Sequence, residues 1–170
     1  MAQTGSIAVV LSFLLGACVG GGDASSGPQV TGTSAPRCET TSGRTNAEAA
    51  SATNAIRGAN GLNALRADPR LAQAAARQAC DMAKRGRMTH RGATSGPMQR
   101  VKAQGYAPRI VAENIAAGPF TMQSALQVWS GSRGHAANIL NPQMRDFGIG
   151  RAVGADGKTV FWSAVYAAPR

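Results

Sequence analysis

The chain has 170 residues and a formal net charge of +10, from 18 Lys and Arg against 8 Asp and Glu. Hydrophobic residues make up 44%, which excludes wholesale disorder because disorder requires low hydrophobicity as well as high charge. Three Cys are too few for a disulfide-dense mini-protein. The charge indicates an acidic partner, such as nucleic acid, an anionic membrane or a wall polymer.

The N-terminus has the pattern of an export signal. The apolar run over residues 7–17 is too short to cross a bilayer and suits the core of a signal peptide. It ends in Leu-Gly-Ala-Cys at Cys18, which resembles a bacterial lipobox, where the Cys is lipidated and the preceding peptide removed. We therefore expect a signal peptide over residues 1–17 and lipidation of Cys18. The alternative is an ordinary secretory signal followed by an unrelated Cys.

Two further Cys, Cys38 and Cys80, remain after this assignment. Export would place them in an oxidising compartment, where a pair of thiols becomes a disulfide by default. The bond would close a loop of about 42 residues and add roughly 3–4 kcal/mol of stability in the chain-entropy model. Two unpaired thiols are the alternative. Residues 18–44 are rich in Gly, Ser, Thr and Pro, which predicts a lipid-anchored flexible linker.

Helical patterns dominate the first part of the domain expected over residues 45–170. Thr45 has the position of an N-cap, with Glu48 three residues later completing a capping box. Asp68 is the expected N-cap of the second helix, and Gly86 is expected to end it. The helices expected from caps, periodicity and breakers cover residues 46–60, 69–85, 97–104, 121–129 and 133–140.

Strand patterns come late in the chain. The expected strands cover residues 110–116, 147–153 and 159–166. Asp156-Gly157 lies between the last two and is a strong signal for a hairpin turn. Helices first and strands last predict an α+β fold with a small, mostly antiparallel sheet.

Few side chains could carry chemistry. The only His residues are His90 and His135, and Glu113 lies in the apolar run over residues 111–116. A carboxylate in such a strand needs partners, because an unpaired buried charge is costly. No spacing among the three is a local metal signature. The pattern alone therefore favours scattered surface and capping residues over a cluster of two His and one carboxylate.

Several motifs follow one another in a diagnostic order. They are MTHRG at 88–92, AENIA at 112–116, VW at 128–129, SRGHAANIL at 132–140 and FGIG at 147–150. This series resembles the CAP superfamily, also called SCP, which groups cysteine-rich secretory proteins, insect venom antigen 5 proteins and plant pathogenesis-related proteins. The Ser-x-Gly-His-x-x-Asn-Ile-Leu form is similar to that of the bacterial branch. The resemblance covers residues 46–167.

The resemblance implies an αβα sandwich with a central cleft. In eukaryotic members this cleft holds two His and two acidic residues, and His90, Glu113 and His135 match three of them. The stretch that would supply the second acid contains Ser132 and no carboxylate. Two imidazoles and one carboxylate could bind Zn²⁺ with an open coordination position. His90, Glu113 and His135 are therefore candidate metal ligands, and a hydrogen-bonded polar cluster without metal is the alternative.

The sequence therefore predicts a monomeric bacterial envelope lipoprotein, in the outer membrane rather than the inner, or a secreted protein. We expect a non-enzymatic protein that binds an anionic envelope component, lipid or glycan through His90, Glu113, Ser132 and His135. The alternative is a metal-dependent hydrolase acting on peptide or cell-wall material. Ser132 and His135 also suggest a Ser-His nucleophile, but the position of Ser132 is better explained as a helix cap. The scarcity of aromatic residues argues against nucleic acid as a partner.

Overall fold

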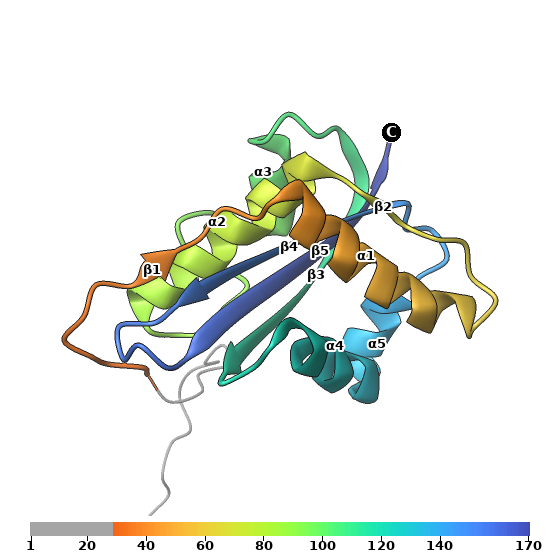
Figure 1. Cartoon of the computed structure of the whole chain (residues 1–170). Helices are drawn as coiled ribbons and strands as arrows, with labels where there is room; N and C mark the ends of the chain where they lie inside the picture. The colour runs from red at the N-terminus through yellow and green to blue at the C-terminus, as the bar shows by residue number, and fades with distance from the viewer. Residues whose placement is uncertain (1–28) are drawn as a thin grey trace, which may run out of the picture.

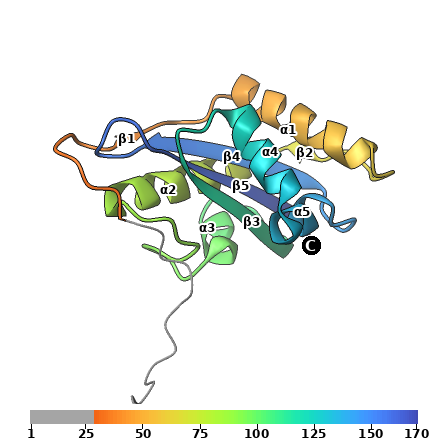
Figure 2. The same ribbon diagram turned by 90° about the horizontal axis from the view of Figure 1, so that it is seen from below.

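The computed structural model describes residues 29–170 and has three layers. The helices are α1 (Gly43–Gly58), α2 (Pro69–Arg85), α3 (Pro97–Lys102), α4 (Met122–Gly131) and α5 (Arg133–Ile139). The strands are β1 (Arg37–Cys38), β2 (Arg66–Ala67), β3 (Pro108–Gly118), β4 (Asp146–Val153) and β5 (Val160–Pro169). Helices α1, α4 and α5 cover one face of the sheet, and α2 and α3 cover the other (Figures 1 and 2). The expected α+β class and αβα sandwich are confirmed.

The sheet has five strands, with β1, β4, β5 and β3 as neighbours in that order and β2 paired to β4. All pairs are antiparallel except the short parallel pair of β2 with β4. Because β3 is an edge strand, side chains from both helical layers can meet beyond its free edge. The two-residue strands β1 and β2 were not predicted, because two exposed residues carry no periodic pattern.

Two predicted helix boundaries need correction. Helix α1 begins at Gly43, and its N-cap is Ser42, whose hydroxyl accepts a hydrogen bond from the Thr45 amide at 3.0 Å. The prediction of Thr45 as the cap is therefore wrong, and Glu48 forms an ion pair with Arg44 at 2.9 Å instead of completing a capping box. The helix also ends at Gly58, earlier than expected.

The caps of α2 agree with the prediction. The Asp68 side chain accepts hydrogen bonds from the amides of Arg70 at 2.8 Å and Leu71 at 3.3 Å. Gly86 ends the helix in a left-handed conformation with φ of 61°. This conformation favours glycine, which has no Cβ to clash with the backbone.

The predicted hairpin between the last two strands has a longer connection than a two-residue turn. Strand β4 ends at Val153 and β5 begins at Val160. The Asp156 carboxylate accepts hydrogen bonds from the amides of Lys158 at 3.0 Å and Thr159 at 2.9 Å. The turn signal at Asp156-Gly157 therefore marks the right place, and the side chain organises a wider loop.

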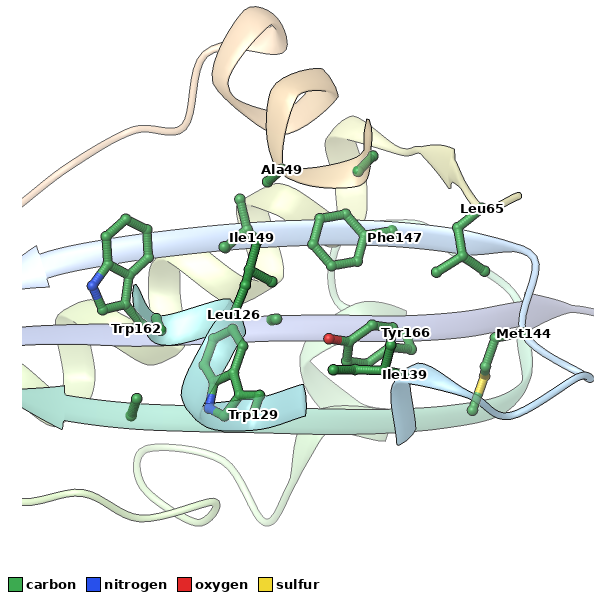
Figure 3. Packing of buried hydrophobic residues seen from close by; sticks show 14 residues of the cluster. Ala49, Leu65, Leu126, Trp129, Ile139, Met144, Phe147, Ile149, Trp162 and Tyr166 are labelled. Atoms are coloured by element: carbon green, nitrogen blue, oxygen red, sulfur yellow. The ribbon is translucent and has the colours of Figure 1, made fainter. Parts of the chain in front are cut away.

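Alternation along β5 divides the core between the two faces of the sheet. Trp162 and Tyr166 pack under α1, α4 and α5 in the cluster of Figure 3, which also contains Trp129 and Phe147. Val165 faces α2 on the other side. In the core on the α2 side, alanines make up nearly half of the buried residues, so helix and sheet lie close together.

Two glycines of β4 permit this close approach. A Cβ on Gly148 would lie 2.1 Å from the Ala72 amide nitrogen, and one on Gly150 would lie 2.1 Å from the Ala76 amide nitrogen. The backbone of α2 therefore rests directly on β4 at these positions. Any larger residue would push the helix away from the sheet.

Residues 37–44, whose composition predicts a flexible linker, are part of the folded domain. β1 pairs with β4, and Cys38 forms a disulfide with Cys80 of α2. The Thr41 hydroxyl donates to the Ile149 carbonyl oxygen at 2.8 Å. The expected disulfide is thus confirmed, and the domain begins before residue 45. The expected signal peptide over residues 1–17 and lipidated Cys18 lie outside the described residues.

In residues 29–170, no helix is long and apolar enough to cross a bilayer.

Candidate functional site

Glu113 of β3 is the centre of the candidate site. Its side chain is 1% exposed, and both carboxylate oxygens have partners. Oε1 lies 2.9 Å from Nδ1 of His90. Oε2 accepts from the Arg100 guanidinium at 2.6 Å and from the Ser163 hydroxyl at 3.1 Å. The buried charge of Glu113 is therefore neutralised by a cation, and each of its oxygens is hydrogen-bonded.

His90 lies in the loop between α2 and α3, which both helices hold in place. The Gln78 side chain of α2 donates to the Thr89 carbonyl oxygen. Arg100 of α3 donates to the His90 carbonyl oxygen at 3.2 Å and to the Thr94 hydroxyl at 3.1 Å. The loop is thus fixed on both sides of His90. The same arginine that neutralises the carboxylate also positions the imidazole.

The His90 side chain is 51% exposed although its Nδ1 contacts the buried carboxylate. A carboxylate on Nδ1 fixes the tautomer and orientation of an imidazole. The other ring nitrogen, Nε2, forms no hydrogen bond within the described residues. His90 therefore offers an oriented polar group to a ligand from solvent.

The opposite face of β3 is tied to α5 by two asparagines. Asn114 donates from its side chain to the His135 carbonyl oxygen at 3.1 Å. Asn138 donates to the Asn114 side-chain oxygen at 2.8 Å and to the Glu113 carbonyl oxygen at 3.3 Å. Adjacent residues of one strand thus serve the two layers, with Glu113 facing α3 and Asn114 facing α5.

His135 belongs to α5, in the layer opposite to the His90 loop. Burial lowers the pKa of His135, and the nearby charge of His90 lowers it further. Both effects disfavour protonation of His135. Its Nδ1 atom is buried without a hydrogen-bond partner in the described part of the chain. This unpaired ring nitrogen is a polar group in need of a ligand.

The predicted site residues are therefore brought together to different degrees. His90 and Glu113 are in direct contact, whereas no hydrogen bond joins the His135 side chain to either of them in residues 29–170. Ser132 occupies the N-cap position of α5, but its side chain forms no capping hydrogen bond. The position of the predicted cap is right and the predicted hydrogen bond is absent. No hydrogen bond joins Ser132 to His135 in residues 29–170, so a Ser-His nucleophile lacks its required contact.

Sequence reasoning missed four polar residues that complete this site, namely Arg100, Ser163, Asn114 and Asn138. Asn114 follows Glu113 directly in an apolar strand, and that polar pair was a usable signal. Arg100 gave none, because a lone arginine in a short helix is normally a solvated residue. Its burial at 5% exposure is decided by the tertiary position of α3.

The donor set fits a metal ion poorly in this arrangement. Within residues 29–170, no group of three or more His, Cys, Asp and Glu side chains is arranged to hold a metal. The Glu113 carboxylate is bound to the Arg100 guanidinium, which a divalent cation would have to displace. Zinc ligation by His90, Glu113 and His135 stays a prediction. The geometry favours the hydrogen-bonded polar cluster.

The family model described as "CAP: Cysteine-rich secretory protein family" matches residues 50–166. The chain belongs to the CAP family. The match spans the candidate site, and it agrees with the resemblance inferred from the ordered motifs. CAP proteins are typically extracellular.

Relatives of this CAP protein include bacterial proteins. An uncharacterised protein of Bacillus subtilis, YkwD, is 35% identical over 99 residues, which are 58% of this chain and 38% of that protein. A Bacillus anthracis extracellular protein containing an SCP domain is 28% identical with a TM-score of 0.64, over 73% of this chain and 40% of the other. A Borrelia burgdorferi outer surface protein is 20% identical with a TM-score of 0.63, over 74% and 90%. The match thus spans well under half of the two Bacillus proteins.

Proposed function

We propose that this CAP protein is exported and anchored to the bacterial envelope by lipid on Cys18. It binds an anionic envelope ligand at a cleft formed by His90, Glu113 and His135. It does so without catalysing a reaction. The observation that carries the proposal is the enclosure of Glu113. Its two oxygens have three hydrogen-bond partners and its side chain is 1% exposed, so little of the carboxylate is accessible to act as a base on a substrate. Nε2 of the half-exposed His90 has no hydrogen-bond partner in residues 29–170 and is available to a ligand.

The charge around the cleft supports an anionic ligand. Arg100 balances Glu113 within the buried pair, so the carboxylate does not repel anions. Arg87 and Arg91 flank His90 in the loop, and both are exposed. Cations at the entrance of a cleft raise the local concentration of an anionic ligand and speed its association.

Binding is tested by calorimetric titration of the purified full chain. Suitable probes are dihexanoyl phosphatidylglycerol, its zwitterionic phosphatidylcholine counterpart, and soluble glycan fragments of a bacterial cell wall. We expect an anionic probe to bind, with affinity that falls as salt is raised because salt screens exposed charges. The double variant His90→Ala/His135→Ala should weaken binding at least tenfold, and Arg109→Gln, an exposed arginine on β3, should leave it unchanged.

A binding isotherm unaffected by the two His substitutions would refute the cleft as the ligand site. The metal-dependent hydrolase is separated by a second titration, with ZnCl₂, of wild type beside the same double variant. Equal heats in the two proteins would remove the metal model. A zinc-dependent loss of substrate in the wild type alone would refute the non-enzymatic proposal.

Lipid anchoring is tested on residues 1–30 fused to a reporter and followed by incorporation of labelled fatty acid. Label on the fusion that disappears with Cys18→Ser supports the anchor. An unlabelled fusion would leave an ordinary secretory signal as the explanation of the N-terminus.

A further inference from the structure

A hollow lies away from His90 and Glu113, between the segment after β1 and the outer face of α2. Its volume is about 660 Å³, and neither His90 nor Glu113 lines it. The Cys38–Cys80 disulfide joins its two sides, since Cys38 is in β1 and Cys80 in α2. In Figure 1 the two elements run beside each other. The volume lies within the range of ligand-binding pockets, ~300–1,000 Å³.

The charged side chains that line this groove are two acids and two cations, and they differ in their pairing. Its acids, Glu39 and Asp81, are each already paired with an arginine outside the lining, at 3.0 Å and 2.9 Å. Its cations, Arg77 and Lys84, are exposed and form no hydrogen bond or ion pair within residues 29–170. Two positive charges are therefore available to a ligand in the groove.

Arg77 and Lys84 are separated by seven residues on α2, which is about 10.5 Å along the helix axis and nearly the same side of the helix. Uncharged hydrogen-bonding groups lie beside and opposite them. Gln73, one turn before Arg77, and Thr40 on the facing segment are exposed. Neither side chain has a hydrogen-bond partner in the described part of the chain. The groove thus combines spaced cations with free amide and hydroxyl groups.

We propose that this groove binds an acidic glycan that carries one carboxylate per disaccharide repeat. Alternate sugars of such a chain would place successive carboxylates against Arg77 and Lys84. The hydroxyls of the sugars would pair with Gln73 and Thr40. Pro69 and the disulfide give apolar surface for the C–H faces of the sugar rings. This site is independent of the ligand proposed for the His90–Glu113 cleft.

The test is calorimetric titration of the full chain at low ionic strength with a hyaluronan tetrasaccharide, which has a carboxylate on every second sugar, beside neutral chitotetraose. We expect binding of the acidic tetrasaccharide only. Arg77→Gln/Lys84→Gln should weaken it at least tenfold. The matched control, Lys102→Gln/Arg109→Gln, removes the same charge from exposed positions outside the groove and should bind like wild type.

Three outcomes would overturn the proposal. Equal affinity for chitotetraose would show that charge is not recognised. Undiminished binding by Arg77→Gln/Lys84→Gln, or an equal loss in the control variant, would show that the groove cations are not the contact. If His90→Ala abolished binding of the acidic tetrasaccharide and the groove variant did not, the glycan site would be the His90–Glu113 cleft. Because His90→Ala should otherwise leave this titration unchanged, failure of the groove and failure of the cleft are distinguished.

Discussion

Removal of Arg100 should be among the most damaging single changes to this protein. Its side chain is 5% exposed and that of Glu113 is 1% exposed, with 2.6 Å between nitrogen and oxygen. Deleting one partner of a buried ion pair leaves the other charge uncompensated, which costs about 3–5 kcal/mol. We therefore expect Arg100→Met to lower the free energy of unfolding by about that amount, or the melting temperature by roughly 6–20 °C for a domain of this size.

The second substitution Glu113→Gln should recover part of this loss. A glutamine side chain is uncharged, so no unpaired buried charge remains, and it can still hydrogen-bond to Ser163 and His90. The double variant should therefore be more stable than Arg100→Met by about 1 kcal/mol or more, within the range of coupling energies for contacting residues. Urea unfolding at pH 7, followed by far-UV circular dichroism, gives each free energy.

The exposed Arg109 offers the control, since Arg109→Met should change stability by no more than ~0.5 kcal/mol. A loss below ~1 kcal/mol in Arg100→Met would refute the reasoning. So would strict additivity of the two substitutions at Arg100 and Glu113, because a buried ion pair must couple them.

Three further predictions concern the fold. The double variant Cys38→Ser/Cys80→Ser should lose about 4 kcal/mol by the chain-entropy model, measured in urea beside the oxidised wild type. Gly150→Ala places a methyl group against the α2 backbone and should cost at least ~1–3 kcal/mol of stability. Gly58→Ala places its methyl group in open space and should not destabilise the protein. Thermal melts of the two variants compare them. Burial alone would raise the pKa of Asp68, but the hydrogen bond and charge of the Arg70 side chain, together with the amides that the cap accepts from, outweigh burial and lower it overall. The contribution of Asp68 to the free energy of unfolding is therefore complete above its pKa in the unfolded chain, and it is lost as the pH falls through its pKa in the folded protein. Asp68→Asn should therefore flatten the dependence of stability on pH below pH 4.

The elements that the sequence predicted well have local causes. Asp68 followed by Pro69, and Gly86 at the far end, define α2 by capping chemistry that needs no tertiary partner. The long strands followed from alternation. The prediction of Thr45 as the N-cap of α1 was wrong because Thr45 and Ser42 both have side chains suited to capping, and the structure places Ser42 at the N-cap.

The segments predicted poorly depend on contacts distant in sequence. Residues 37–44 have linker composition, yet β1 gains its hydrogen bonds from β4 and its covalent tie from Cys80. Composition cannot report a partner more than a hundred residues away. The site shows the same division, since the ordered motifs gave His90, Glu113 and His135. The buried cation beside Glu113 became visible only in three dimensions.

The positive charge of Arg100 changes the net charge of the site around Glu113. The resemblance to eukaryotic CAP proteins implies two imidazoles and two acids, a set with enough negative charge to attract a metal ion. Here the second acid is missing, and the remaining carboxylate is neutralised by Arg100. The buried pair is therefore close to charge balance. A charge-balanced pair has little attraction for a divalent cation, which is the physical reason to test acidic envelope ligands before metals.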